Sequence, residues 1–152
     1  MKNNSGMRNL TRLQTIIMAV GALLMVVGIF ITFICIGNMA TFTMRSISAV
    51  SFAAGTVMFA TMQMLQVYDG SDMTVRRLRR IMIFGDICLI MSGLLMVEQT
   101  FQIVFPLFAT SIEGYNQYCH YVHNNWGVLL LISCVLELYS IFRLSNELKK
   151  EA

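Results

Sequence analysis

Two carboxylates stand inside segments that are otherwise long, apolar and typical of membrane helices. Asp86 lies six residues after Arg80, and Glu137 lies six residues before Arg143. At about 1.5 Å per residue, each carboxylate is about 9 Å along its helix from a basic residue that marks the same side of the membrane. Counting along the preceding helix places Gln63 at nearly the same level. Carboxyl and amide groups gathered at one depth inside a membrane are suited to binding a proton or a cation.

Two serines accompany Glu137 on its predicted helix. Ser133, Glu137 and Ser140 follow one another at i, i+4 and i+7, which places them on one helix face. Because a charge that faces lipid is costly, we expect this polar stripe to point into the helix bundle. Two interpretations of the cluster Gln63, Asp86 and Glu137 stay open. It binds a proton or a cation, or its carboxyl groups are protonated, hydrogen-bonded or paired with arginines and hold the helices in register, which we favour.

Glu98 is a further carboxylate in the segment that holds Asp86. The two are twelve residues apart in the sequence, so that Glu98 is rotated by about 120° from Asp86 around the helix axis. We therefore expect that these two carboxylates do not line one path along the helix.

Four arginines crowd into the segment "RRLRR", between the second and the third apolar segments. Anionic lipid attracts basic residues beside a membrane helix by about 1 kcal/mol each, whereas a nucleic-acid surface would need more basic area than one helical turn offers. We therefore predict a lipid-facing basic patch, with anionic headgroups as partners and no nucleic acid. Its members are Arg76, Arg77, Arg79 and Arg80.

The segment "YCHYVHNNW" brings a thiol and two imidazoles together among aromatic residues. A closed zinc site needs four ligands. The candidates near this segment are Cys119, His120, His123 and Glu113. An aromatic belt at the outer membrane interface explains the tyrosines and Trp126 without a metal. We therefore predict neither a metal site nor a cofactor.

Cys35 is expected at the outer end of the first helix, on the same side as Cys119. In an oxidising compartment these two would form the plausible disulfide. Cys88 and Cys134 fall in the inner half of the membrane, where we expect them to stay thiols.

The elements that must position these groups are membrane helices. Of 152 residues, 57% are hydrophobic and 12% are charged, against about 25% charged in an ordinary soluble domain. No formally charged residue occurs between Arg12 and Arg45 or between Arg45 and Asp69, and each run exceeds the ~20 residues that cross a bilayer. We predict an all-α integral membrane protein, one membrane domain built as a four-transmembrane-helix bundle. The predicted helices span residues 13–36, 46–68, 81–105 with an extension from residue 73, and 122–143.

Basic residues set the predicted orientation. Ten of the eleven Lys and Arg residues lie on one side of the predicted helices, and only Arg45 lies on the other. Because Lys and Arg in short loops stay in the cytoplasm, both termini are predicted to be cytoplasmic. The first apolar run follows a basic flank but exceeds the ~7–15 residues of a signal-peptide core, so we expect it to stay uncleaved.

Two short stretches of internal sequence similarity share one offset along the chain. "LLMV" at Leu23 returns at Leu94, and "LQVY" at Leu65 aligns with "LELY" at Leu136, both 71 residues later. The shared offset is consistent with two parallel hairpin repeats, related by an axis along the membrane normal. Chance similarity between leucine-rich segments is the other interpretation.

Small residues are spaced along the first two predicted helices so that they lie on one face of each helix. Gly21 and Gly28 lie on one face of the first helix, and Ser51 and Gly55 are four residues apart on the second. We expect them to allow close backbone contact between these helices.

Several segments are distinctive enough for comparison with a family. They are "MQMLQVYDG" at 62–70, "VRRLRRIMI" at 75–83, "VHNNW" at 122–126, "LELY" at 136–139 and "SNELKKEA" at 145–152. In them the chain resembles a family of uncharacterised small four-span bacterial inner-membrane proteins. The resemblance implies the topology predicted above and a location in the bacterial inner membrane. It implies no activity and no catalytic residue.

No nucleophile, metal set or cofactor motif is evident in the sequence, so we do not expect an enzyme. The leading hypothesis is an accessory or assembly protein that contacts another membrane protein, a second copy or anionic lipid. The alternative is a small transporter, or an ion- or proton-binding membrane protein, that uses Asp86 and Glu137. A water-accessible cavity reaching either carboxylate would favour the transporter, and a solid helical core would favour the accessory protein.

Overall fold

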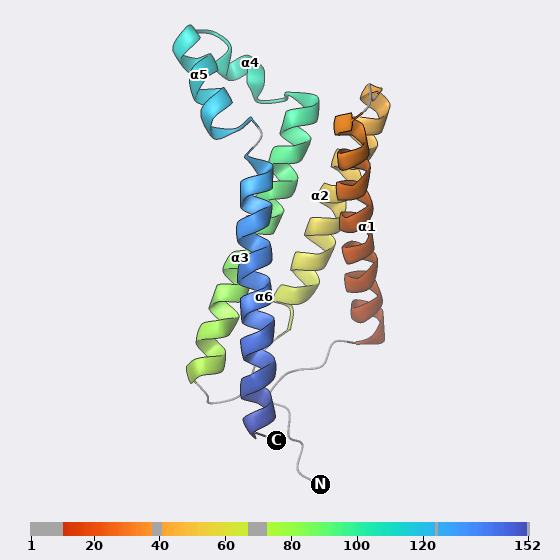
Figure 1. The fold of residues 1–152 in the computed structure, drawn as a ribbon, viewed down its shortest axis with the longest axis vertical. Helices are drawn as coiled ribbons and strands as arrows, with labels where there is room; N and C mark the ends of the chain where they lie inside the picture. The colour runs from red at the N-terminus through yellow and green to blue at the C-terminus, as the bar shows by residue number, and fades with distance from the viewer. Residues whose placement is uncertain (1–10, 38–40, 67–72, 124, 152) are drawn as a thin grey trace.

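The structure is a computed structural model that describes residues 11–37, 41–66, 73–123 and 125–151. The described chain is helical and contains no strand (Figure 1). Its helices are α1 (Arg12–Gly37), α2 (Phe42–Met64), α3 (Met73–Phe101), α4 (Phe105–Phe108), α5 (Ile112–Tyr121) and α6 (Trp126–Glu151).

Four segments of the described chain are long and apolar enough to cross a membrane. They are Arg12–Cys35 in α1, Phe42–Met64 (α2), Met73–Phe101 (α3) and Ile112–Glu147, which includes α5 and most of α6. The predicted all-α fold with four candidate transmembrane helices is therefore confirmed at the level of length and composition. The start of α1, the start of α3 and the end of α6 lie at one end of the molecule, which we call the basal end (Figure 1). The opposite end, with α4 and α5, is the distal end. The cytoplasmic orientation of the termini stays a prediction.

Several helix boundaries differ from the predicted ones. α2 begins at Phe42 rather than at residue 46, and its predicted end at residue 68 lies outside the described residues. α3 begins at residue 73 as predicted, but it ends at Phe101 rather than at residue 105. The reason is Gln102, whose φ of 52° is left-handed and stops the helix. Pro106, which directly follows the predicted end of this helix, stands in the first turn of α4.

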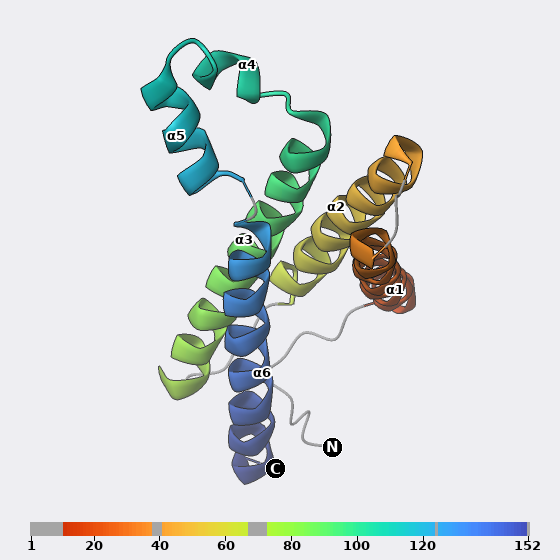
Figure 2. The ribbon, with the colours of Figure 1, turned by 45° about the horizontal axis from the view of Figure 1, so that its top comes forward.

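The long helices follow one another in a row (Figure 2). α1 packs against α2, α2 also packs against α3, and α3 also packs against α6. Within the described residues, the backbone of α1 does not approach α3 or α6. The bundle is therefore open, and α1 has a single helical neighbour.

Glycines bring α1 and α2 into backbone contact. A Cβ on Gly55 would lie 2.7 Å from the carbonyl oxygen of Gly21, and one on Gly28 would lie 2.8 Å from the amide nitrogen of Phe52. Both distances are too short for a real side chain, so the close packing predicted for Gly21, Gly28 and Gly55 is confirmed. Ser48 on α2 adds a polar contact, because its hydroxyl donates a hydrogen bond to the carbonyl oxygen of Gly28 at 2.8 Å.

An apolar core joins the two helix pairs. Ala49, Phe52 and Met96 are buried together, and Trp126 at the start of α6 packs against them. The rings of Phe52 and Trp126 meet edge to face with centroids 6.2 Å apart. This core therefore ties α2 to α3 and α6.

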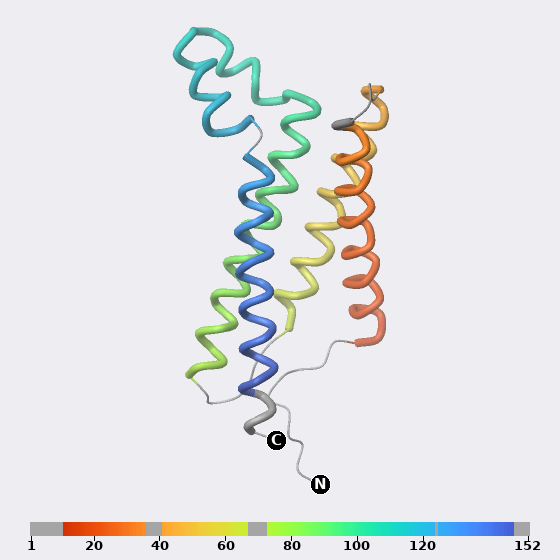
Figure 3. Tube along the Cα trace, viewed as in Figure 1, coloured from red at the N-terminus to blue at the C-terminus, as the bar shows by residue number. Residues whose placement is uncertain are grey.

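Glu98 connects α3 to the helices α4 and α5, which together we call the distal cap. Its carboxylate accepts hydrogen bonds from the backbone nitrogens of Val104, at 2.9 and 3.0 Å, and Phe105, at 3.2 Å. The hydroxyl of Tyr118 on α5 donates to the same carboxylate at 3.1 Å. One carboxylate thus holds the first turn of α4 and the middle of α5 beyond the end of α3 (Figure 3). The position of Glu98 in the sequence does not indicate this role.

Candidate functional site

Three helices bring the predicted polar cluster together in the interior. Gln63 comes from α2, Asp86 from α3 and Glu137 from α6. Asp86 is completely buried and Gln63 is 4% exposed. The side-chain amide of Gln63 donates a hydrogen bond to Oε2 of Glu137. The carboxyl groups of Asp86 and Glu137 lie close enough to interact electrostatically.

A glycine makes room for Glu137 on the surface of α3. A Cβ on Gly85 would lie 3.3 Å from Oε1 of Glu137 and 3.4 Å from Cβ of Leu136. The carboxyl group therefore lies against the α3 backbone, next to Asp86. The two matched positions in the sequence, six residues from Arg80 and six from Arg143, do lead to neighbouring carboxyl groups.

Ser133 and Ser140 lie on the same inward face of α6. Their exposed fractions are 0% and 1%, and Glu137 between them is half-buried. The predicted inward polar stripe on α6 is therefore confirmed. Neither serine hydroxyl has a hydrogen-bond partner among the described residues.

Arg79 belongs to this interior cluster, and its predicted place on a lipid-facing patch is wrong. Its side chain is 8% exposed, and Nη2 donates to the backbone carbonyls of Gln63, at 2.7 Å, and Met64, at 3.4 Å. These carbonyls belong to the last turn of α2, where helix geometry leaves them without an intrahelical donor. A cation is also favourable at this negative end of the helix dipole. Arg79 therefore caps the C-terminus of α2.

The phase of α3 explains why Arg79 differs from its neighbours. Arg79 lies seven residues before Asp86, which is close to two helical turns and places both on one face. Arg76, Arg77 and Arg80 are exposed. Those three remain as the basic patch at the basal end. The spacing of seven between Arg79 and Asp86 is the signal in the sequence that could have identified the buried arginine.

Several polar atoms of the cluster have no hydrogen-bond partner among the described residues. Neither oxygen of Asp86 makes a well-aligned hydrogen bond, and neither Oε1 of Glu137 nor Nη1 of Arg79 has a partner in the described part of the chain. Arg79 is near enough to both carboxyl groups to attract them. One buried cation thus stands beside two carboxyl groups. Buried ionised carboxylates are costly unless they are paired, so the arrangement suits one charged carboxylate and one protonated partner.

The residues considered for metal or disulfide chemistry lie elsewhere. His120 stacks on Tyr121 with ring centroids 4.9 Å apart, and His123 is exposed. Cys35 is buried near the distal end of α1, Cys119 is exposed on α5, and both are free thiols in the structure. A disulfide between them was expected only in an oxidising compartment, and the structure shows both as thiols.

Comparisons with known protein families, with curated proteins and with solved structures found no match for this chain. The family resemblance that the sequence segments suggest therefore stays a prediction.

Proposed function

We propose that this chain is a non-enzymatic integral membrane protein that acts by contact, as an accessory or assembly subunit of a bacterial inner membrane. The observation that carries this proposal is the complete burial of Asp86 at the meeting point of three helices. A carboxyl group without solvent contact, beside a helix-capping Arg79 and a Gln63–Glu137 hydrogen bond, is placed to fix helices together.

The basal surface supports contact with anionic lipid. Arg76, Arg77 and Arg80 are exposed near the start of α3, and Arg143 near the end of α6 is exposed too. Each such residue attracts an anionic headgroup by about 1 kcal/mol. With the basal end in the cytoplasm, as basic residues in short loops favour, this patch would meet the inner leaflet.

α1 supports contact with another membrane protein or a second copy. It packs against α2 alone within the described residues, and large apolar side chains cover its outer face. Among them are Leu23, Val26, Phe30 and Phe33, each about two-thirds exposed. Such a helix can exchange lipid for a protein partner without breaking contacts inside the chain.

Native mass spectrometry of the protein extracted from its own membranes in mild detergent tests this proposal. We expect a stoichiometric complex, or a monomer that retains anionic lipid, rather than a bare chain of 17.2 kDa. Phe30→Ala with Phe33→Ala should release a protein partner, whereas Phe142→Ala, an equally exposed site on α6, should not. Arg76→Gln should weaken lipid retention. A bare monomer under all these conditions would overturn the proposal.

A second function is favoured by the unsatisfied oxygens of the cluster. Both oxygens of Asp86 and Oε1 of Glu137 are buried without hydrogen-bond partners among the described residues. This is the arrangement expected of a small transporter, or an ion- or proton-binding protein, that shares one proton or small cation between the two carboxyl groups. Such a protein must open the cluster to water at some stage, so its proton flux should depend on Glu137.

A further inference from the structure

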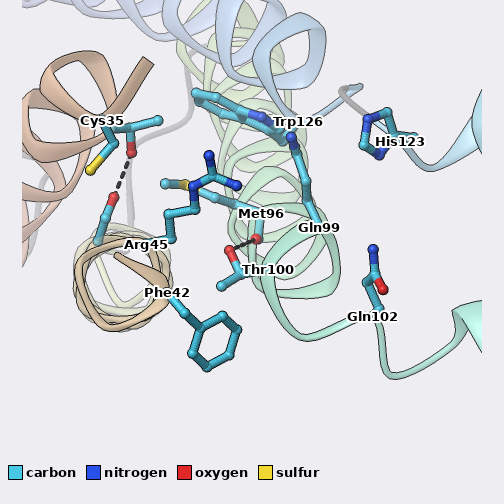
Figure 4. A pocket seen from close by; sticks show the side chains of 11 residues that line it. Cys35, Phe42, Arg45, Met96, Gln99, Thr100, Gln102, His123 and Trp126 are labelled. Carbon is cyan, nitrogen blue, oxygen red and sulfur yellow. Dashed lines mark hydrogen bonds between the residues drawn. The ribbon is translucent and has the colours of Figure 1, made fainter. Parts of the chain in front are cut away.

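A pocket of about 610 Å³ lies at the distal end, between α1 and α2 on one side and α3 and the start of α6 on the other (Figure 4). Its volume falls within the ~300–1,000 Å³ typical of small-molecule sites. The residues that give it its chemical character are Arg45, Met96, Gln99, Gln102, His123 and Trp126. None of them belongs to the interior cluster described above.

The shape of the bundle explains the pocket. α2 and α3 separate toward the distal end (Figure 2). The apolar core fills the space between them only as far as Met96 and Trp126, which form part of the pocket wall. The rest of the lining includes polar side chains, among them Arg45, Gln99 and His123, together with Phe42 at the start of α2. The pocket therefore offers an apolar surface next to hydrogen-bonding groups.

Arg45 places an uncompensated positive charge in this pocket. It lies in the first turn of α2, and that turn contains no acidic residue. The N-terminus of a helix is itself the positive end of the helix dipole and favours an anion. Within the described part of the chain, the Arg45 side chain makes no hydrogen bond and no ion pair. The ion pair found among these residues joins Arg143 to Glu147. Arg45 and the N-terminus of α2 therefore both make the electrostatic potential inside the pocket more positive.

Further side chains in the pocket are available to a ligand. The Oε1 atom of Gln99 is buried and has no partner among the described residues. Because the oxygen and nitrogen of a side-chain amide are interchangeable by rotation, Gln99 can present a donor instead. Thr32 and Thr100 are already occupied, by Ser48 and by the carbonyl of Met96 at 3.1 Å. Figure 4 shows Arg45 extending from α2 on one side of the pocket and Gln99 from α3 on the other, with the Trp126 ring above them in the view.

We propose that this pocket binds an anionic phosphate group, carried by a lipid headgroup or by a small soluble molecule. Arg45 supplies the counter-charge through its planar set of donors, which matches a phosphate. Gln99 and His123 donate further hydrogen bonds to the phosphate or to the polar group next to it. Met96 and Trp126 contact the apolar part of the ligand. This site is separate from the proposed contact of the basal arginines with lipid. The two proposals are tested independently of each other.

Trp126 is the only tryptophan in the chain and lines the pocket, so its fluorescence reports directly on occupancy. The full chain in neutral detergent is titrated with short-chain phosphatidylglycerol, with short-chain phosphatidylcholine and with glycerol phosphate. We expect a saturable change with phosphatidylglycerol that weakens as salt is added. Arg45→Gln should weaken it about tenfold or more, since hydrogen bonds to a charged group are lost. Arg45→Lys should retain part of the affinity.

The control variant is Arg12→Gln, which removes an exposed arginine at the start of α1, at the basal end and outside both proposed binding sites, and should bind as the unchanged protein does. If glycerol phosphate saturates the pocket as well, the phosphate alone is recognised; if only the lipid does, its chains contribute to binding. Should Arg45→Gln fold poorly, Gln99→Met, which keeps the size but removes the amide, should still weaken binding. Equal binding of phosphatidylcholine with no effect of Arg45→Gln or Gln99→Met would overturn the proposal, as would no response to either anionic probe.

Discussion

Replacing Arg79 by methionine tests whether the interior cluster holds the helices together. Methionine keeps most of the side-chain volume but removes the guanidinium. The carbonyls of Gln63 and Met64 at the end of α2 then lose the guanidinium donor, and the Gln63 carbonyl keeps, among the described residues, only the backbone N–H of Gln66, at 3.2 Å. Asp86 and Glu137 also lose the nearby positive charge. The change therefore acts on α2, α3 and α6 together.

The expected size follows from burial and geometry. Losing hydrogen bonds to a charged group costs about 1.5–3 kcal/mol, and removing one partner of a buried charge pair costs about 3–5 kcal/mol. Arg79 is 8% exposed, but its attraction to the carboxyl groups is not a direct ion pair, so we expect a loss of about 3 kcal/mol in the free energy of unfolding. Adding Asp86→Asn to Arg79→Met should restore about 1 kcal/mol, because it removes one uncompensated acid from the interior.

Unfolding by sodium dodecyl sulfate in mixed micelles, followed by Trp126 fluorescence, measures these free energies. Trp126 contacts Phe52 in the core, so its emission reports the packing of α6 on α2 and α3. Arg76→Met, an exposed arginine one turn earlier on α3, is the matched control and should change stability by less than about 0.5 kcal/mol. The reasoning is refuted if Arg79→Met unfolds at the same free energy as Arg76→Met.

Further substitutions test the other contacts. Gly55→Leu should separate α1 from α2 and lower stability, because even a Cβ there would lie 2.7 Å from the α1 backbone; Gly127→Leu, with no atom within 4 Å of its Cβ, should be tolerated in the same unfolding assay. Glu98→Leu should free the distal cap, seen as faster proteolysis within residues 105–121, and unchanged cleavage would contradict its clamping role. Glu137→Gln should leave the free energy of unfolding nearly unchanged, since membrane hydrogen bonds average only about 0.6 kcal/mol; Glu137→Leu should lower it by about 1–3 kcal/mol, and equal stability of the two would contradict this.

Much of this architecture could be predicted because the lengths of the apolar segments and the positions of the charged residues can be read directly from the sequence. The gaps between charged residues locate α1 and α2. Equal distances from the flanking arginines place Asp86 and Glu137 at one level, where the structure brings them together with Gln63.

What could not be predicted depends on helix rotation and on tertiary contacts. Four adjacent arginines do not differ in composition, and the phase of Arg79 with Asp86, seven residues later, identifies it as the inward one only once Asp86 is known to be buried. The helices α4 and α5 are short, with 4 and 10 residues, and they are held by Glu98, a partner that only the folded chain supplies. The open row of helices, with α1 against α2 alone, follows from glycine contacts whose strength cannot be judged from composition.

Glu137 makes the central claim testable in one measurement, the decay of a pH gradient across proteoliposomes that contain the purified protein. If the cluster fastens helices and Asp86 stays shielded from water, the gradient should decay at the rate of protein-free vesicles, both with the unchanged protein and with Glu137→Gln. Glu113→Gln, at an exposed carboxylate on α5, serves as the matched control. Rapid decay with the unchanged protein and with Glu113→Gln, but not with Glu137→Gln, would show instead that Glu137 carries protons across the membrane.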